Sequence, residues 1–155
     1  MIYTKFGDIT FKVRVAGILT RNGKVLIHKN PSDDFFALPG GRANVAEDTV
    51  HTMIRKMKEE INVDVFVDWL AGVYESFYSN NGEQFHQLTF YYRIGTDDAS
   101  LYERGDTFDG HGDLSHLKYL WVSLDELDDI VFYPESIKEI IKNPLPYTKH
   151  RIEFD

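Results

Sequence analysis

Two adjacent carboxylates, Glu59 and Glu60, lie at the end of a segment whose spacing indicates a helix. Upstream of them, Glu47, His51 and Arg55 follow at intervals of four residues, which places them on one slowly drifting polar stripe. A pair of glycines precedes this segment, and glycine lets backbone groups approach a ligand closely. Mg²⁺ prefers oxygen ligands and usually takes one or two carboxylates together with substrate phosphates. The segment is therefore a candidate site for a divalent cation.

An amphipathic helix must position these acids. Apolar residues recur at i, i+3, i+4, i+7 and i+11 opposite the polar stripe, namely Val50, Met53, Ile54, Met57 and Ile61. Asn44 and Glu47 have the spacing of a capping box, which predicts Asn44 as the N-cap. Asn62 suits a left-handed residue that ends the helix.

Strands and turns surround this helix. Asn22-Gly23 between apolar runs at 11–20 and 25–28 predicts a hairpin. Further elements are expected as strands at 63–74, 84–94 and 117–122, a helical turn after residue 123 and a helix at 134–142. The acidic, glycine-rich segment 95–116 between them is expected to be a functional loop. The order β-β-α-β-β-β-α predicts an α/β fold with helices packed on a mixed sheet.

The spacing of the helical residues resembles the Nudix box. That signature has Gly, five residues, Glu, seven residues, Arg-Glu, an aliphatic, any residue, Glu-Glu, any residue, Gly and an aliphatic. The residues that fall in register are Gly41, Glu47, Arg55, Met57, Glu59, Glu60 and Val63. The preceding Leu38-Pro39-Gly40 and the late segment 121–127 also look like the family.

The resemblance implies the Nudix fold, an α/β/α sandwich around a mixed β-sheet, over a single domain at 1–155. It implies Mg²⁺- or Mn²⁺-dependent hydrolysis of the diphosphate linkage in a nucleoside diphosphate derivative, such as the nucleotide sugar ADP-ribose or a nucleoside triphosphate. By this resemblance Glu59 and Glu60 are the metal ligands, and Arg55 orients them by bonding a carboxylate in two places. Glu47 is either an outer acid or a structural cap.

Substrate contacts are carried over in the same way. The Gly40-Gly41 turn is expected to contact the substrate or to contribute a backbone carbonyl, and Arg14 on the first strand to lie over the phosphates, although a surface charge there is an equal alternative. One aromatic side chain is a candidate to stack on a nucleobase, although core packing is the favoured alternative for each of them. The candidates are Phe35, Phe36, Tyr74, Phe77 and Tyr78, with His86 as a less favoured pocket residue.

Two positions depart from the signature. Asn62 replaces the glycine, which is a mild change because asparagine also adopts a left-handed cap. Lys56 replaces the Glu that follows the box Arg, and a protonated lysine cannot ligate a cation. Neighbouring carboxylates also raise the pKa of a lysine, which makes Lys56 a poor base near neutral pH.

Three outcomes remain open for this altered box. Two carboxylates with one metal suffice for slow hydrolysis, or the domain is catalytically impaired and acts as a nucleotide-binding or regulatory module. Alternatively, another acid supplies the base, and the candidates are Glu75, Glu83, Glu103, Asp106, Asp109 and Asp113. An acid that points at Glu59 and Glu60 would favour the enzyme, whereas Lys56 buried among salt bridges would favour the binding module.

Composition bounds the partners. The 155 residues carry a formal net charge of −8 without a basic cluster, which argues against duplex nucleic acid as a partner. No apolar run approaches the roughly 18 residues of a membrane span and no signal segment is visible, so a cytoplasmic protein without a membrane partner is expected. Segment 147–155 is expected to be a tail or a strand that docks on a second subunit of a homodimer.

Overall fold

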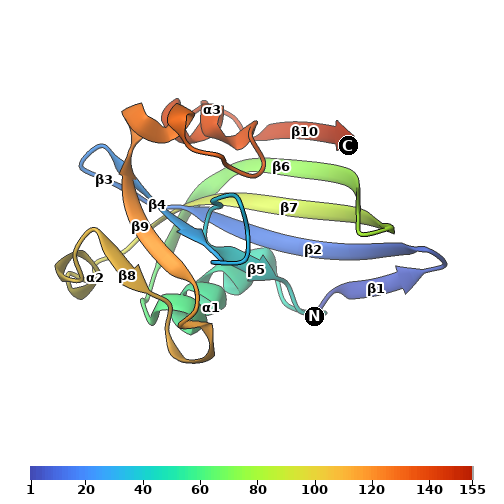
Figure 1. The fold of residues 1–155 in the computed structure, drawn as a ribbon, viewed down its shortest axis with the longest axis horizontal. Helices are drawn as coiled ribbons and strands as arrows, with labels where there is room; N and C mark the ends of the chain where they lie inside the picture. Colours follow the sequence, from blue (N-terminus) through green and yellow to red (C-terminus); the bar gives the residue numbers. More distant parts are fainter. Residues whose placement is uncertain (155) are drawn as a thin grey trace.

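Ten strands and three short or medium helices make up the fold in a computed structural model that describes residues 1–154 (Figure 1). The strands are β1 (Tyr3–Phe6), β2 (Ile9–Ile18), β3 (Thr20–Arg21), β4 (Lys24–Lys29), β5 (Gly40–Arg42), β6 (Phe66–Asn80), β7 (Glu83–Gly95), β8 (Thr107–Asp109), β9 (Lys118–Ser123) and β10 (Lys149–Phe154). The helices are α1 (Thr49–Ile61), α2 (Ser100–Glu103) and α3 (Ile137–Lys142), with 3₁₀ turns η1 (Gly112–Leu114) and η2 (Leu124–Asp129).

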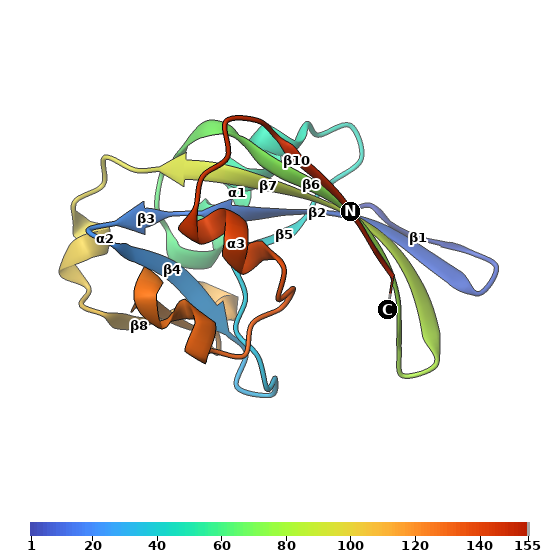
Figure 2. The same cartoon turned by 90° about the horizontal axis from the view of Figure 1, so that it is seen from above.

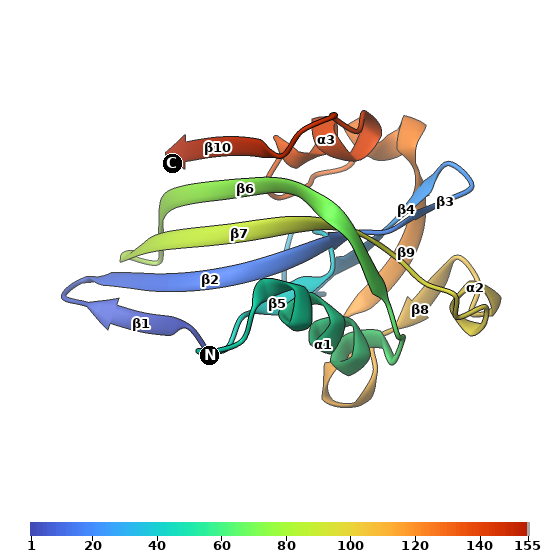
Figure 3. The same ribbon diagram turned by 180° about the vertical axis from the view of Figure 1, so that it is seen from behind.

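Two sheets share the strands. One runs in the order β1-β2-β7-β6-β10, with β5 paired to β2, and is mixed because β2–β7 and β6–β10 are parallel. The other is antiparallel in the order β3-β4-β9-β8. Figure 3 shows the strands of the larger sheet side by side, with α1 against β2 and β5. The expected mixed sheet is confirmed, and the second sheet adds to it.

Alternation along the central strands builds a core on each face. On β2, Val15 packs into the cluster that includes Met53 and Met57 of α1, whereas Ala16 packs into the cluster that includes Ile137 of α3. Successive side chains of a strand point to opposite faces, so α1 and α3 cover opposite sides. Figure 1 shows α3 above and α1 below the strands. This arrangement is the expected α/β/α sandwich.

Several local predictions can be compared directly with the structure. Asn22 and Gly23 both have positive φ in the β3–β4 turn, which confirms the hairpin. Segment 95–116, expected to be a loop, contains regular secondary structure in α2, β8 and η1. The described part of segment 147–155 forms strand β10 and not a tail; β10 pairs in parallel with β6 of the same chain, and docking on a second subunit stays a prediction. Residue 155 lies outside the described residues.

Two turns of the larger sheet project from one end of the molecule (Figure 2). Figure 2 shows the β1–β2 and β6–β7 turns reaching away from the end that carries α2. Among residues 1–154, no helix combines the length and the apolar character needed to cross a membrane.

Candidate active site

The helix that carries the acids starts later than its sequence suggests. Asp48, rather than Asn44, is the N-cap of α1, and its carboxylate accepts a hydrogen bond from the His51 backbone N–H at 2.9 Å. Glu47 therefore lies just before the helix, where its carboxylate accepts from the Asn44 backbone N–H at 3.1 Å. At the other end Asn62 has φ 56° and ψ 47°, so the left-handed cap is confirmed.

Glu47 and Arg55 form a closed ion pair at the entrance to α1. Arg55 donates from Nε and Nη2 to the two carboxylate oxygens of Glu47 at 2.7 and 3.0 Å, and Nη2 also reaches the Arg42 carbonyl at 3.1 Å. Thr52 donates to the same carboxylate at 2.8 Å. The bonds from Arg55 lower the pKa of Glu47 to about 2. Arg55 thus links Glu47 to the Arg42 carbonyl of β5 and holds β5 against α1.

Glu59 lies one turn further along and is open to solvent. Its carboxylate accepts from Arg55 at 2.9 Å and from Lys56 at 3.3 Å, while its side chain stays 46% exposed. Partial burial acts to raise its pKa, but the bonds from Arg55 and Lys56 outweigh this and lower it. Glu59 is therefore ionised and accessible.

Glu60 has the opposite environment, since it is 2% exposed. Tyr119 of β9 donates to its Oε1 at 2.6 Å, and burial raises the pKa of Glu60 to about 7. His28 of β4 lies 3.8 Å from the same oxygen, and burial lowers the pKa of His28 to about 4, so the imidazole is neutral near pH 7. Among the described residues, Glu60 Oε2 and His28 Nδ1 have no hydrogen-bond partner. Buried polar atoms are normally paired, so these two indicate a place for a ligand or water.

The two glycines meet different neighbours. A Cβ on Gly40 would lie 1.9 Å from the Val15 carbonyl oxygen, because β5 packs directly on β2. A Cβ on Gly41 would lie 2.1 Å from Lys56 Cε, so the glycine makes room for this side chain. Gly40 serves the packing of the sheet, and Gly41 serves the position of Lys56.

These groups open onto a cavity of about 860 Å³ between α1, β2 and β5. Five of the described residues lining it are cationic, namely Lys12, Arg14, Arg42, Arg55 and Lys56, and the acids lining it are Asp33, Glu59 and Glu60. Burial, with the neighbouring charges of Arg14 and Arg42, lowers the pKa of Lys12 to about 8. Burial and the charge of Arg42 also lower the pKa of Arg14. Clustered cations that destabilise one another are suited to an anionic ligand.

A family model described as the NUDIX domain matches residues 10–143, which is most of the chain. The chain belongs to the Nudix family. A relative described as ADP-ribose pyrophosphatase, from Methanocaldococcus jannaschii, is 39% identical over 67 residues, which cover 41% of this chain and 40% of that relative. The chain thus matches well under two thirds of the relative's length.

Solved structures show the same fold. A Nudix hydrolase from Nitrosomonas europaea has a TM-score of 0.67 at 22% identity, covering 93% of this chain and 79% of that chain. An ADP-ribose pyrophosphatase from Streptococcus suis has a TM-score of 0.56 at 14% identity, covering 92% and 98%. At these identities the likeness establishes the architecture.

Most of the Nudix box residues named above line the cavity, but Glu47 does not. Gly40, Gly41, Arg55, Glu59 and Glu60 line the cavity together with Arg14. Glu47 does not line it and is held by Arg55 behind the wall. The contacts of Glu47 are therefore structural, while the catalytic and metal roles of the box residues stay predictions.

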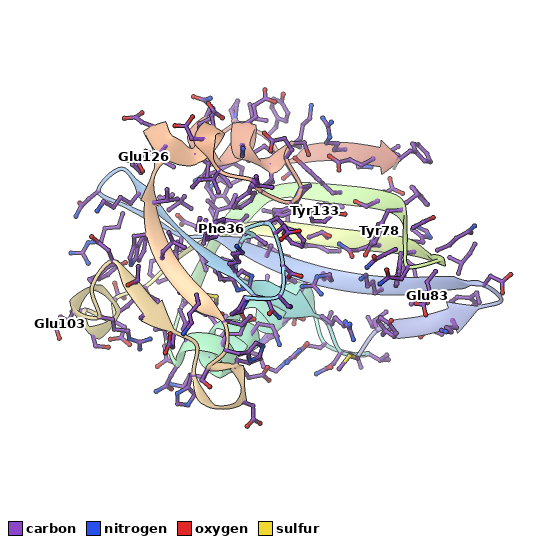
Figure 4. The ribbon with its side chains drawn as sticks, in the orientation of Figure 1. Phe36, Tyr78, Glu83, Glu103, Glu126 and Tyr133 are labelled. Carbon is purple, nitrogen blue, oxygen red and sulfur yellow. The ribbon has the colours of Figure 1, made fainter. Side chains whose placement is uncertain are left out.

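None of the expected alternative bases lines this cavity. Asp106 pairs with Lys24 at 3.5 Å, Asp109 with Lys118 at 2.6 Å and Glu75 with His150 at 2.6 Å. Figure 4 shows Glu103 and Glu83 at opposite ends of the molecule. Asp113 lies in η1 and is exposed.

Of the aromatic candidates for stacking on a nucleobase, only some line the cavity. Tyr74 is 1% exposed in the core, Phe36 packs against the same core, and Phe77 stacks with His86 at 4.5 Å. Phe35 and Tyr78 do line the cavity, and Tyr133 lies with them. Figure 4 shows Tyr133 and Tyr78 toward the same part of the sheet.

Sequence reasoning missed residues that reach the site by tertiary contact, including Arg42, His28, Tyr119 and Tyr133. Lys12 was identifiable, because it alternates with Arg14 on one face of β2.

A resident divalent metal does not fit the acids as they stand. Nudix hydrolases generally use divalent metals. Among residues 1–154, however, no group of three or more His, Asp or Glu side chains is placed to hold one. Glu60 Oε1 is occupied by Tyr119, and the Lys56 ammonium bonds Glu59. We therefore derive no step through a protein-held metal.

Proposed function

We propose that this chain is a Nudix pyrophosphohydrolase that acts on the diphosphate linkage of a nucleoside diphosphate derivative. The observation that carries the proposal is the arrangement of Lys12, Arg14 and Arg42 in the same cavity as Glu59 and Glu60 of the Nudix box. Arg guanidinium groups bind phosphate oxygens in two places, and lysine adds a point charge. The single domain spans residues 1–155 in this proposal.

ADP-ribose is the first substrate to test. A relative with 39% identity over part of the chain is described as ADP-ribose pyrophosphatase. The cavity also continues toward a second one of about 410 Å³, and Phe35, Tyr78 and Tyr133 line both. The rings of Phe35 and Tyr133 have centroids 5.6 Å apart. A nucleobase would stack on these rings while its diphosphate lies against the cations.

The side chains of this site would bind, orient and hold protons. The cations would neutralise the diphosphate oxygens, on which negative charge builds up during hydrolysis. Glu60, buried beside Tyr119, would exchange a proton with a water molecule near its unpaired Oε2. Because Lys56 crowds the acids, any Mg²⁺ or Mn²⁺ needed for hydrolysis, as distinct from binding, would arrive with the substrate.

A second candidate function is a nucleotide-binding module without turnover. Lys56 is mostly buried and paired with Glu59, and Asp33 is the acid outside the box that lines the cavity among the described residues. The pairing of Lys56 with Glu59 is the observation that supports the binding module.

A substrate panel separates the two functions. The purified protein is incubated with ADP-ribose, other nucleotide sugars, dinucleoside polyphosphates and nucleoside triphosphates, with Mg²⁺ or Mn²⁺, and Glu59→Gln serves as the control. Release of a monophosphate that disappears in the control supports the hydrolase. Thermal stabilisation by a ligand without product supports the binding module.

Substitution of Arg14 tests whether the cations Lys12, Arg14 and Arg42 bind the diphosphate. We expect Arg14→Gln to raise KM, or Kd for a silent domain, by about tenfold because a buried charged contact to phosphate is lost. Lys5→Gln, an exposed position on β1, is the matched control and should change neither constant. Equal constants for Arg14→Gln and the wild type would contradict the placement of the diphosphate.

A further inference from the structure

Lys56 is an unusual residue for its position, since its side chain is only 19% exposed. Lysine is rarely buried unless it is paired. Its Nζ lies 3.3 Å from Glu59 Oε2, and its charge also acts on Glu60. The ammonium is therefore an ion-pair partner of Glu59, which is adjacent to Glu60 in the box.

Gly41 holds this ammonium in place from the other side. A Cβ at Gly41 would lie 2.1 Å from Lys56 Cε and 2.9 Å from Nζ, so the lysine tip fills the space that the glycine leaves. Gly41 belongs to β5, and Lys56 to α1. The lysine tip thus lies between Gly41 and Glu59.

We propose that the Lys56 ammonium is a tethered cation that takes the place of a resident metal ion, so that the site binds a diphosphate without a divalent cation. Glu59 is ionised beside the cavity and would repel a diphosphate, and the ammonium offsets this charge. A second, divalent cation at the same place would be repelled by the ammonium and would lack ligands at the 2.0–2.1 Å that Mg²⁺ demands.

Mn²⁺ binding by the protein alone tests the proposal without any nucleotide. Free Mn²⁺ is measured by electron paramagnetic resonance during titration of the wild type, Lys56→Gln and Lys56→Glu. We expect Lys56→Gln to bind Mn²⁺ at least about threefold more tightly than the wild type, and Lys56→Glu at least about tenfold, because the first removes a positive charge and the second adds a ligand. Wild-type binding as tight as that of both variants would overturn the proposal.

ADP-ribose binding supplies the second readout and rests on the proposed function. Calorimetric titration of the wild type in EDTA and in Mg²⁺ should give dissociation constants within about threefold of each other. Lys56→Gln should bind about tenfold more weakly in EDTA. Lys58→Gln is the matched control, because Lys58 lies on the same helix, is half-exposed and pairs with Asp64 outside the cavity.

The outcomes distinguish the two proposals. A wild type that needs Mg²⁺ to bind ADP-ribose, or Lys56→Gln that binds as tightly as the wild type in EDTA, overturns the tethered cation. Failure of ADP-ribose to bind under every condition removes that ligand from the proposed function, and the Mn²⁺ titration still decides the role of Lys56. Thermal unfolding checks that each variant is folded, and Lys56→Gln alone suffices if Lys56→Glu does not fold.

Discussion

The two ends of α1 carry similar charged residues in very different environments. At its N-terminal end, Glu47 receives four hydrogen bonds, two of them from Arg55, and all of its partners belong to the protein. At its C-terminal end, Glu59 is half-exposed, and Glu60 is buried with one oxygen unpaired among the described residues. The first end is complete by itself, whereas the second leaves atoms that a ligand can satisfy.

This difference separates structural from functional acids within one motif. A carboxylate whose hydrogen bonds are all satisfied contributes to stability, and its removal leaves a partner unpaired. A carboxylate kept open to a cavity contributes little to stability and can act on a ligand. The three glutamates should therefore respond differently to mutation.

The largest effect on stability is expected at the closed end. Glu47→Ala should lower the free energy of unfolding by about 2 kcal/mol, because it leaves Arg55 without its main partner in a partly buried place. The pKa of Glu47 is lowered to about 2 in the folded state, so its stabilisation is present above pH 4.5 and lost as pH falls toward 2. Urea unfolding at pH 7 and pH 2.5 measures both. A deficit that stays the same at pH 2.5 would contradict this account.

An effect of comparable size with the opposite pH dependence is expected at Glu60. Its pKa is raised to about 7, so the folded state binds the proton more tightly than the unfolded state, and stability falls as pH rises from about 4.5 to 7. Gln keeps an acceptor for Tyr119 and cannot ionise. The difference in unfolding free energy, wild type minus Glu60→Gln, should therefore fall by roughly 1–3 kcal/mol between pH 5 and pH 8. A difference independent of pH would show that Glu60 titrates normally.

The smallest effect on stability is expected at Glu59. Glu59→Ala should change the free energy of unfolding by less than about 0.5 kcal/mol, because exposed ion pairs are screened by solvent and salt. Its loss should nevertheless impair hydrolysis or alter ligand affinity. A destabilisation as large as that of Glu47→Ala would remove the distinction between the two ends of the helix.

Local patterns predicted much of this fold. The apolar stripe placed Met53 and Met57 in the core, and Asn-Gly gave the first hairpin, because both signals depend on neighbouring residues. The box spacing likewise brought Gly41, Arg55 and Glu59 to one cavity.

Long-range contacts escaped sequence reasoning. Tyr119 and His28 meet Glu60 because they are paired residues of β4 and β9, and no local pattern indicates that pairing. The N-cap was misplaced because Asn44 and Asp48 are both good capping residues, and the tertiary bond from Arg55 to Glu47 accompanies the later start. β10 was missed as an intramolecular strand because the β6 residues that it pairs with lie 77 positions earlier.

The parallel addition of β10 to β6 replaces part of a long edge of the larger sheet with a shorter edge strand of six residues. β6 is fifteen residues long, and β10 covers Gly72–Phe77 of its otherwise open edge. An uncovered edge presents unpaired N–H and C=O groups that another chain can join, which leads to aggregation or strand exchange. Detachment of β10 would therefore expose the longer edge of β6 to pairing with another chain.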